Sequence, residues 1–122
     1  MGFVLLLMAF GSFIVTFVGY VGLVGKLPPN PWAGIRTPYT MSSPEAWYAT
    51  HRAAGPPIIF GGVLVFATCA AFAPFALAGK IPDAVSFTVA LASAIVILVT
   101  VISAWLGGTR QARRELEKAG KK

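Results

Sequence analysis

Three long stretches without a charged residue limit what this chain can fold into more than any other feature. They cover residues 2–25, 53–79 and 84–109. Each exceeds the roughly 20 residues that an α-helix needs to cross a hydrocarbon core about 30 Å thick. Charged residues make up 11% of the chain, against about a quarter in a soluble domain. We therefore expect an all-α membrane protein with three transmembrane helices, near residues 3–24, 58–78 and 84–106.

The basic residues predict how these helices cross the membrane. Nine of the ten lie in the connection 26–55 or in the tail 110–122, and only Lys80 lies in the short turn between the second and third helices. By the positive-inside rule, the amino terminus is expected outside, and the connection and the tail in the cytoplasm. The first stretch is expected to stay as a helix, because it lacks the basic start of a secretory signal. The predicted location is the bacterial cytoplasmic membrane, which the chain crosses several times.

Composition also excludes several classes of function. A small multidrug exporter needs an acidic residue in a helix to couple protons, and the three charge-free stretches contain none. One histidine and one cysteine do not provide a metal site, and no serine-histidine-acid order with a nucleophile-elbow motif is present. Basic residues gathered in a tail are not a nucleic-acid groove. No catalytic, cofactor-binding or metal-binding residue is predicted, and nucleic acid is not an expected partner.

The connection 26–55, here called the polar connection, carries most of the remaining polar residues. Its first half should run extended after the prolines around Asn30, and Trp32 should bring the chain back to headgroup depth. Gly34 permits a close approach or a turn. Arg36 has two interpretations: a surface cation facing phosphates, or a clamp on Glu45 or on backbone carbonyls.

The second half of the polar connection predicts a short helix over residues 44–54. Ser42 with Glu45 has capping-box spacing, whereas Ser43 as the cap would place a proline at the first helical position. The sequence Gly55-Pro56-Pro57 should end the helix. We expect this helix to be amphipathic and to lie at the cytoplasmic interface. Trp47 and His51 would share one face, with Trp47 sunk as an anchor and Arg52 near water.

The residues of the polar connection resemble the signature of the SdpI family of small bacterial membrane proteins. The matching pattern is Asn30, then Gly34-Ile35-Arg36-Thr37-Pro38, Thr40, Ser42, Trp47, His51 and Gly55. The resemblance implies three helices with the signature between the first two. It also implies immunity to a secreted membrane-killing peptide, coupled to signalling at the membrane, as in longer founding members of the family. It carries no catalytic residue.

Three functions are therefore expected to compete. The first is an SdpI-like, non-enzymatic membrane protein that resists or senses a membrane-active peptide or envelope stress. The second is a small accessory or structural subunit of a larger membrane complex. The third is recognition of lipid headgroups by Arg36, Arg52 and the basic tail. Residues 1–109 would form the membrane domain, and the tail would continue the third helix and touch anionic lipid. The candidate partner-binding residues are Asn30, Trp32, Gly34, Arg36, Thr37, Thr40, Ser42, Glu45, Trp47, His51, Arg52 and Gly55.

Overall fold

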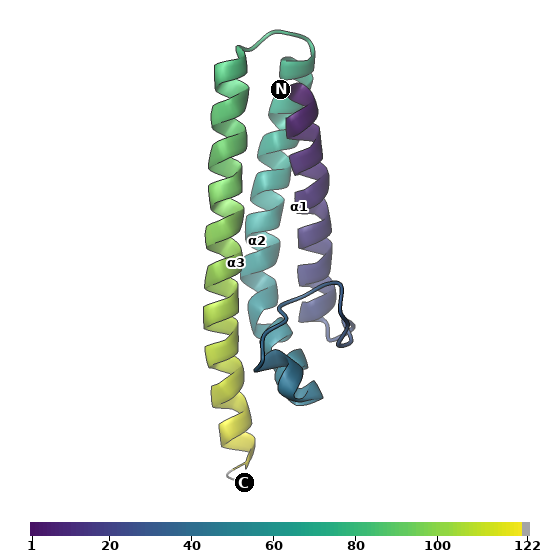
Figure 1. Cartoon of the computed structure of the whole chain (residues 1–122), viewed down its shortest axis with the longest axis vertical. Helices are drawn as coiled ribbons and strands as arrows, with labels where there is room; N and C mark the ends of the chain where they lie inside the picture. Colours follow the sequence, from purple (N-terminus) through teal and green to yellow (C-terminus); the bar gives the residue numbers. More distant parts are fainter. Residues whose placement is uncertain (121–122) are drawn as a thin grey trace.

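Three long helices make up almost the whole molecule (Figure 1). A computed structural model describes residues 1–120. The elements are α1 (Gly2–Leu23), the single-turn helix η1 (Thr40–Ser42), α2 (Pro44–Leu77) and α3 (Asp83–Gly120). Residues 1–120 contain no strand. The predicted fold class is confirmed, because all three α-helices are long and apolar enough to cross a membrane.

The predicted end of the short helix at Gly55 is wrong. α2 continues through Pro56 and Pro57, so residues 44–54 are its first turns and do not form a separate interfacial helix. The prolines lack the N–H groups that would bond to carbonyls four residues earlier, and such sites bend a helix rather than always ending it. The first turns of α2 lean away from the rest in Figure 1. Both prolines are exposed.

The start of α2 decides between the two caps that the sequence allowed. The Ser43 hydroxyl accepts a hydrogen bond from the Ala46 N–H at 3.0 Å, and Pro44 occupies the first helical position. Ser42, the last residue of η1, instead donates its hydroxyl to the carbonyl of Tyr39, which caps the start of η1. Pro44 loses nothing there, since its missing N–H would have no partner in the first turn.

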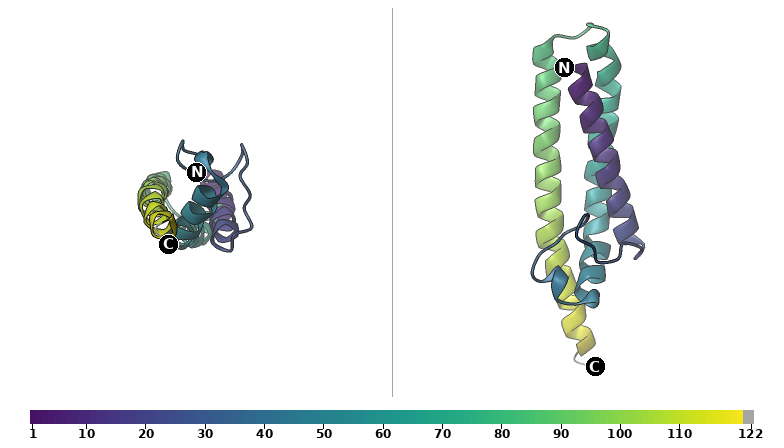
Figure 2. Two further views of the ribbon diagram at one scale, coloured as in Figure 1. Left: turned by 90° about the horizontal axis from the view of Figure 1, so that it is seen from below. Right: turned by 45° about the vertical axis from the view of Figure 1, so that its right-hand side comes forward.

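The helices differ in length, and the longer helices α2 and α3 extend past α1 at one end of the bundle. At 1.5 Å per residue, α1 is about 33 Å long, α2 about 51 Å and α3 about 57 Å. Residues 78–82 join α2 and α3 as an antiparallel hairpin, with Gly79 at φ +69°. The first turns of α2 and the last turns of α3 therefore extend together beyond the end of α1 (Figure 2). The tail continues α3 as far as Gly120, while Lys121 and Lys122 lie outside the described residues. Which side of the membrane this end faces stays a prediction.

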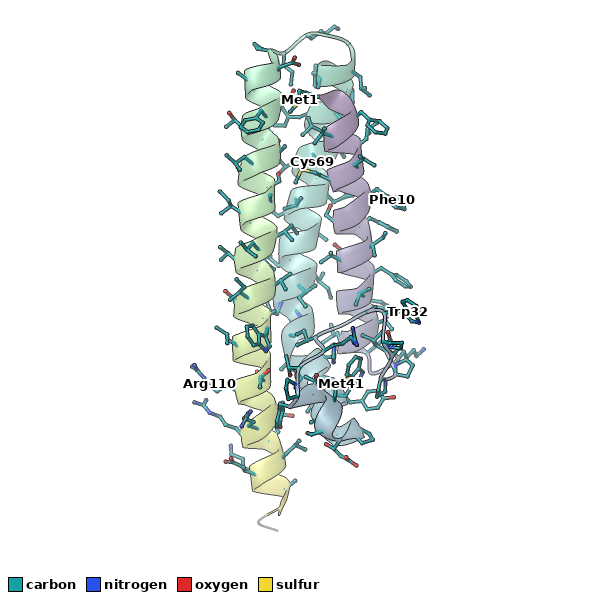
Figure 3. The ribbon with its side chains drawn as sticks, in the orientation of Figure 1. Met1, Phe10, Trp32, Met41, Cys69 and Arg110 are labelled. Carbon is teal, nitrogen blue, oxygen red and sulfur yellow. The ribbon has the colours of Figure 1, made fainter. Side chains whose placement is uncertain are left out.

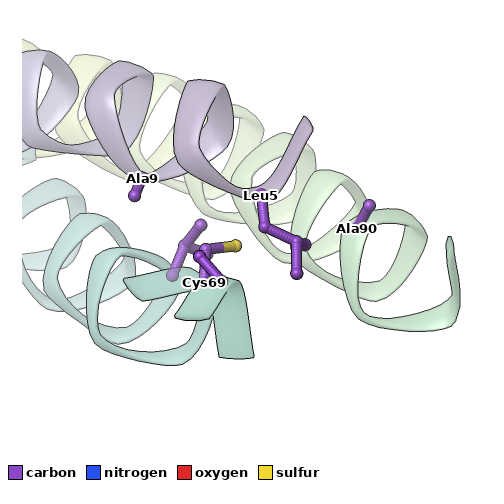
Figure 4. Packing of buried hydrophobic residues seen from close by; sticks show 6 residues of the cluster. Leu5, Ala9, Cys69 and Ala90 are labelled. Atoms are coloured by element: carbon purple, nitrogen blue, oxygen red, sulfur yellow. The ribbon is translucent and has the colours of Figure 1, made fainter. Parts of the chain in front are cut away.

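α2 packs between α1 and α3, which hardly touch each other. Two adjacent glycines of α2 face the two neighbours: a Cβ on Gly61 would meet Thr100 of α3, and one on Gly62 would meet Thr16 of α1. This agrees with the expectation that small residues allow close packing in lipid. Between these glycines and the turn that joins α2 to α3, a buried core takes residues from all three helices (Figure 4), namely Leu5, Ala9, Val65, Cys69, Ala73 and Ala90.

Four hydroxyl groups within the apolar helices satisfy themselves locally, whereas the buried Ser86 hydroxyl of α3 has no partner within residues 1–120. Thr16, Thr68 and Thr88 each donate to the carbonyl four residues earlier, at 2.8 Å. Ser12 donates to the carbonyl three residues earlier at 2.9 Å. Such bonds remove the cost of placing a hydroxyl in lipid. These four side chains therefore have a structural explanation and give no sign of a transport path.

Candidate functional site

The loop between α1 and α2, residues 24–43, folds back over the first turns of α2 (Figures 1 and 2). Asn30 shapes its first half. The Asn30 side-chain oxygen accepts hydrogen bonds from the Trp32 N–H at 2.8 Å and the Ala33 N–H at 2.7 Å. Its amide nitrogen donates to the Pro28 carbonyl at 2.8 Å. An asparagine that bonds to the backbone two residues on fixes a turn, so Asn30 has a structural role in this loop.

Trp47 holds the loop to α2 and is not a membrane anchor. Its side chain is 0% exposed, whereas an anchor must present its ring to the headgroups. The indole Nε1–H donates to the Leu27 carbonyl at 2.7 Å. The ring also stacks on His51, with centroids 4.2 Å apart. The predicted shared face of Trp47 and His51 therefore exists, but it faces the loop and the bundle.

His51 joins the loop to α2 through both ring nitrogens. Nδ1 lies 2.7 Å from the Trp47 carbonyl, and Nε2 accepts a hydrogen bond from the Ile35 N–H at 2.8 Å. A carbonyl requires a proton on Nδ1 and an N–H donor requires a bare Nε2, so these contacts select the neutral ring with its proton on Nδ1. His51 is 4% exposed. Burial lowers its pKa below the ordinary value, and the bond to the Trp47 carbonyl partly offsets this.

Gly34 makes the contact between the loop and this pair possible. Its φ is +110°, in a region that side chains rarely adopt. A Cβ at Gly34 would lie 2.7 Å from His51 Nε2 and 3.1 Å from the Trp47 ring. Gly22 of α1 lies on another side of His51, where a Cβ would come within 3.1 Å of the histidine Cβ. Gly34 and Gly22 thus allow the loop and α1 to pack directly against His51.

Thr40 forms hydrogen bonds with two earlier residues of the loop, Ile35 and Thr37. The Thr40 hydroxyl donates to the Ile35 carbonyl at 2.7 Å and accepts from the Thr37 N–H at 2.8 Å. The Thr40 N–H donates in turn to the Thr37 hydroxyl at 3.2 Å. Thr40 is buried. Its hydroxyl fixes the carbonyl of Ile35, whose N–H donates to His51.

The other predicted side chains point outward. Arg36 and Glu45 are both exposed, and no ion pair joins them within residues 1–120, so the predicted clamp on Glu45 is wrong. Arg36 also has no hydrogen bond to a backbone carbonyl there. Arg52 pairs instead with Glu115 of α3, at 4.0 Å. Trp32 is 90% exposed, which agrees with the expectation that it lies free for headgroups.

The far end of the loop reaches α3 through a contact that the sequence did not predict. The Arg113 guanidinium lies 4.3 Å from the centre of the Tyr39 ring. An arginine over an aromatic face is attracted by the ring quadrupole. These residues are 74 positions apart, and no spacing rule links such distant residues. The loop thus starts at α1, crosses α2 and ends against α3.

An apolar groove lies between α1 and α3, with α2 as its floor, and is called the α1–α3 groove below. It consists of two cavities of about 230 and 520 Å³ that share Val15 and Val101. The smaller cavity ends against Gly34, Ile35 and His51. No carboxylate, lysine or arginine lines either cavity. The groove therefore suits an apolar ligand, and the loop closes one of its ends.

The neutral state of His51 gives the loop an expected pH dependence. The folded pKa lies below the ordinary value of about 6.5, so between these two values the unfolded chain binds more protons. Stability then rises with pH through this window, is complete above about 6.5, and falls on acidification. The thermal unfolding midpoint in detergent should be lower at pH 5.5 than at pH 7.5. His51→Gln should remove this difference, and an equal pH dependence in that variant would contradict the assignment.

Comparison with known families gives one match. A model described as the SdpI/YfhL protein family matches residues 26–104. The matched range begins just after α1 and includes the loop, α2 and the apolar part of α3. No curated protein and no solved structure matches the chain. All the contacts of Trp47, His51 and Thr40 with the loop fall inside the matched range, whereas Arg113 falls outside it.

Proposed function

The chain belongs to the SdpI/YfhL protein family, and on that premise we propose that it protects a bacterial cytoplasmic membrane by binding a membrane-active peptide. The α1–α3 groove is the proposed binding site. One observation carries this proposal: an uncharged groove, open between two helices, ends at the loop that holds the family signature. A peptide that acts inside the bilayer presents apolar side chains, and such a groove can bury them.

The contacts of His51 support a binding role rather than catalysis. Both of its ring nitrogens already engage backbone groups, so neither is free to take a proton from a nucleophile. A general base must have a nitrogen within reach of the proton that it removes. The same contacts make the loop a firm end wall for the groove.

The proposal can be tested by deleting the gene and challenging the cells with a panel of pore-forming peptides. The deletion should sensitise cells to at least one peptide, and the wild-type gene should restore resistance. Gly11→Leu should fail to restore it, because Gly11 lines the groove and a Cβ there meets nothing within 4 Å. Its added side chain would fill the groove without disturbing the bundle.

Gly107→Leu is the matched control. A Cβ on Gly107 also meets nothing within 4 Å, but this glycine lines neither cavity of the groove. The variant should restore resistance fully. Unchanged sensitivity of the deletion strain across the whole panel would contradict a protective role. Equal failure of both leucine variants would contradict the groove as the site.

An aromatic stripe on α1 favours the alternative of an accessory subunit. Phe3, Phe10 and Phe17 are spaced by seven residues and are all strongly exposed. A spacing of seven places them along one line of a helix, as in helix pairs. Under this alternative, a larger membrane protein would cover the stripe, and purification in mild detergent would recover it in a fixed ratio. Under the peptide-binding proposal, the protein purifies without such a partner.

A further inference from the structure

A second groove lies on the other side of the loop, against α3, and is called the arginine groove below. Its volume is about 590 Å³. One wall is the loop segment 37–39, and the other is α3 between residues 105 and 113. It shares no lining residue with the α1–α3 groove. Figure 3 shows Arg110 on α3 at the end of the bundle where the loop lies.

Two arginines in this groove have no acidic partner within residues 1–120. Arg110 and Arg113 both line it, and no carboxylate does. The ion pair found within residues 1–120 joins Arg52 to Glu115 and involves neither of them. The Arg113 guanidinium lies over the Tyr39 ring, and a guanidinium has five N–H donors, so this contact leaves donors available for a ligand. The groove therefore offers two fork-shaped sets of donors, which match the geometry of a phosphate.

The side chains along α3 change in a fixed order through the groove. Trp105 and Leu106 come first and are apolar, the Thr109 hydroxyl follows, and the two arginines come last. The Thr109 hydroxyl has no hydrogen-bond partner within the described residues. A phospholipid has the same order, from acyl chain through ester oxygens to phosphate. The two orders align because Trp105 and Leu106 end the apolar stretch of α3, which places the arginines at headgroup depth.

We propose that the arginine groove is a binding site for one anionic phospholipid. Arg110 and Arg113 hold the phosphate, and one acyl chain lies against Trp105 and Leu106. The sequence suggested Arg36, Arg52 and the basic tail for headgroup recognition; Arg110 and Arg113 of the tail line this groove, whereas Arg36 and Arg52 do not. The proposal is independent of peptide binding, because it uses a different groove. It also rests on two arginines beyond the part of the chain that the family model matches.

Lipid titration with native mass spectrometry tests the site on the full-length protein in detergent. The probes are phosphatidylglycerol, which is anionic, and phosphatidylcholine, which is not. The wild-type protein should bind phosphatidylglycerol more tightly. Arg110→Gln/Arg113→Gln should weaken that binding roughly thirtyfold, since each basic residue near an anionic surface adds about 1 kcal/mol. The same variant should weaken phosphatidylcholine binding less, because the choline ammonium offsets the charge of its phosphate.

Arg114→Gln/Lys118→Gln is the matched control, because it removes the same charge from the same end of α3. Both residues are exposed and neither lines the groove. The control should bind phosphatidylglycerol within about twofold of the wild type, whereas nonspecific attraction by net charge would weaken both double variants equally. Arg110→Gln alone guards against misfolding, since Arg110 makes no hydrogen bond or ion pair within residues 1–120; it should show part of the loss.

Three results would overturn the proposal. They are equal losses in the two double variants, no preference for phosphatidylglycerol in the wild type, and full displacement of the lipid by millimolar inorganic phosphate. The first means diffuse attraction only, the second means no headgroup recognition, and the third means a site for free phosphate. None of these results depends on resistance to peptides, so failure here and failure of the peptide-binding proposal can be told apart.

Discussion

Replacing Gly34 with alanine should detach the loop from α2 and lower the free energy of unfolding by roughly 2–4 kcal/mol. Two costs add at this position. A side chain in a sparsely populated backbone region costs on the order of 1–3 kcal/mol, and the φ of Gly34 is +110°. The new Cβ would also lie 2.7 Å from His51 Nε2, so the hydrogen bond from the Ile35 N–H must break or the loop must move.

Gly25→Ala separates these two costs. Gly25 also has a positive φ, +76°, but a Cβ there meets nothing within 4 Å. Its substitution should cost about 1 kcal/mol, which is the backbone strain alone. Thermal unfolding in one detergent measures both variants. Fluorescence of Trp47, compared in a Trp32→Phe/Trp105→Phe background that leaves it as the single tryptophan, should report exposure of its ring only in Gly34→Ala. Equal effects of the two alanines would show that the contact with His51 contributes nothing.

Replacing Gly55 with valine should separate α1 from α2 near the loop. A Cβ on Gly55 would lie 2.7 Å from the Leu23 Cβ and 2.9 Å from the Gly19 carbonyl oxygen. Backbone atoms of α1 cannot turn aside as a flexible side chain can, so the whole helix must shift. Overpacking of this kind costs about 1–3 kcal/mol. We expect a lower unfolding midpoint and faster proteolysis within the loop, which follows directly from α1.

The matched control for Gly55 is Gly107→Val in α3. Both glycines lie inside long helices, so valine carries the same small change in helix propensity in each. Gly107 has open space where its Cβ would be, and its substitution should leave the midpoint within about 1 °C. A similar drop in both variants would show that helix propensity, and not contact with α1, decides the result.

The sequence was sufficient for the three helices and for the position of the signature, because both depend on local patterns. Charge-free length predicts a membrane helix without knowledge of its neighbours. The Ser43 cap was likewise one of two local alternatives. The continuation of α2 through Pro56 and Pro57 was not predictable in this way. Helix breaking by proline is a local tendency, and it was overridden here by a helix that packs Gly55 tightly against α1.

The candidate site was harder to predict because its contacts join residues that are distant in sequence. Trp47 resembled an interfacial anchor, since its type and position fit that role. Its burial depends on the Leu27 carbonyl, which lies 20 residues earlier. The positions of the charges in the sequence also suggested a wrong ion pair. Glu45 is near Arg36 in sequence, but the ion pair in the structure joins Arg52 to Glu115 of α3. The contact between Tyr39 and Arg113 can be predicted only when the position of α3 relative to the loop is known.

The course of the loop has a consequence for how molecules reach the α1–α3 groove. The loop is joined to α1 by the chain itself, fixed to α2 by Trp47 and His51, and set against α3 at Arg113. It therefore ties the two outer helices together at one end of the bundle only. The groove is therefore closed by the loop at one of its ends. Under the peptide-binding proposal, a ligand would enter this groove sideways from the bilayer, and its travel would stop at Gly34 and His51.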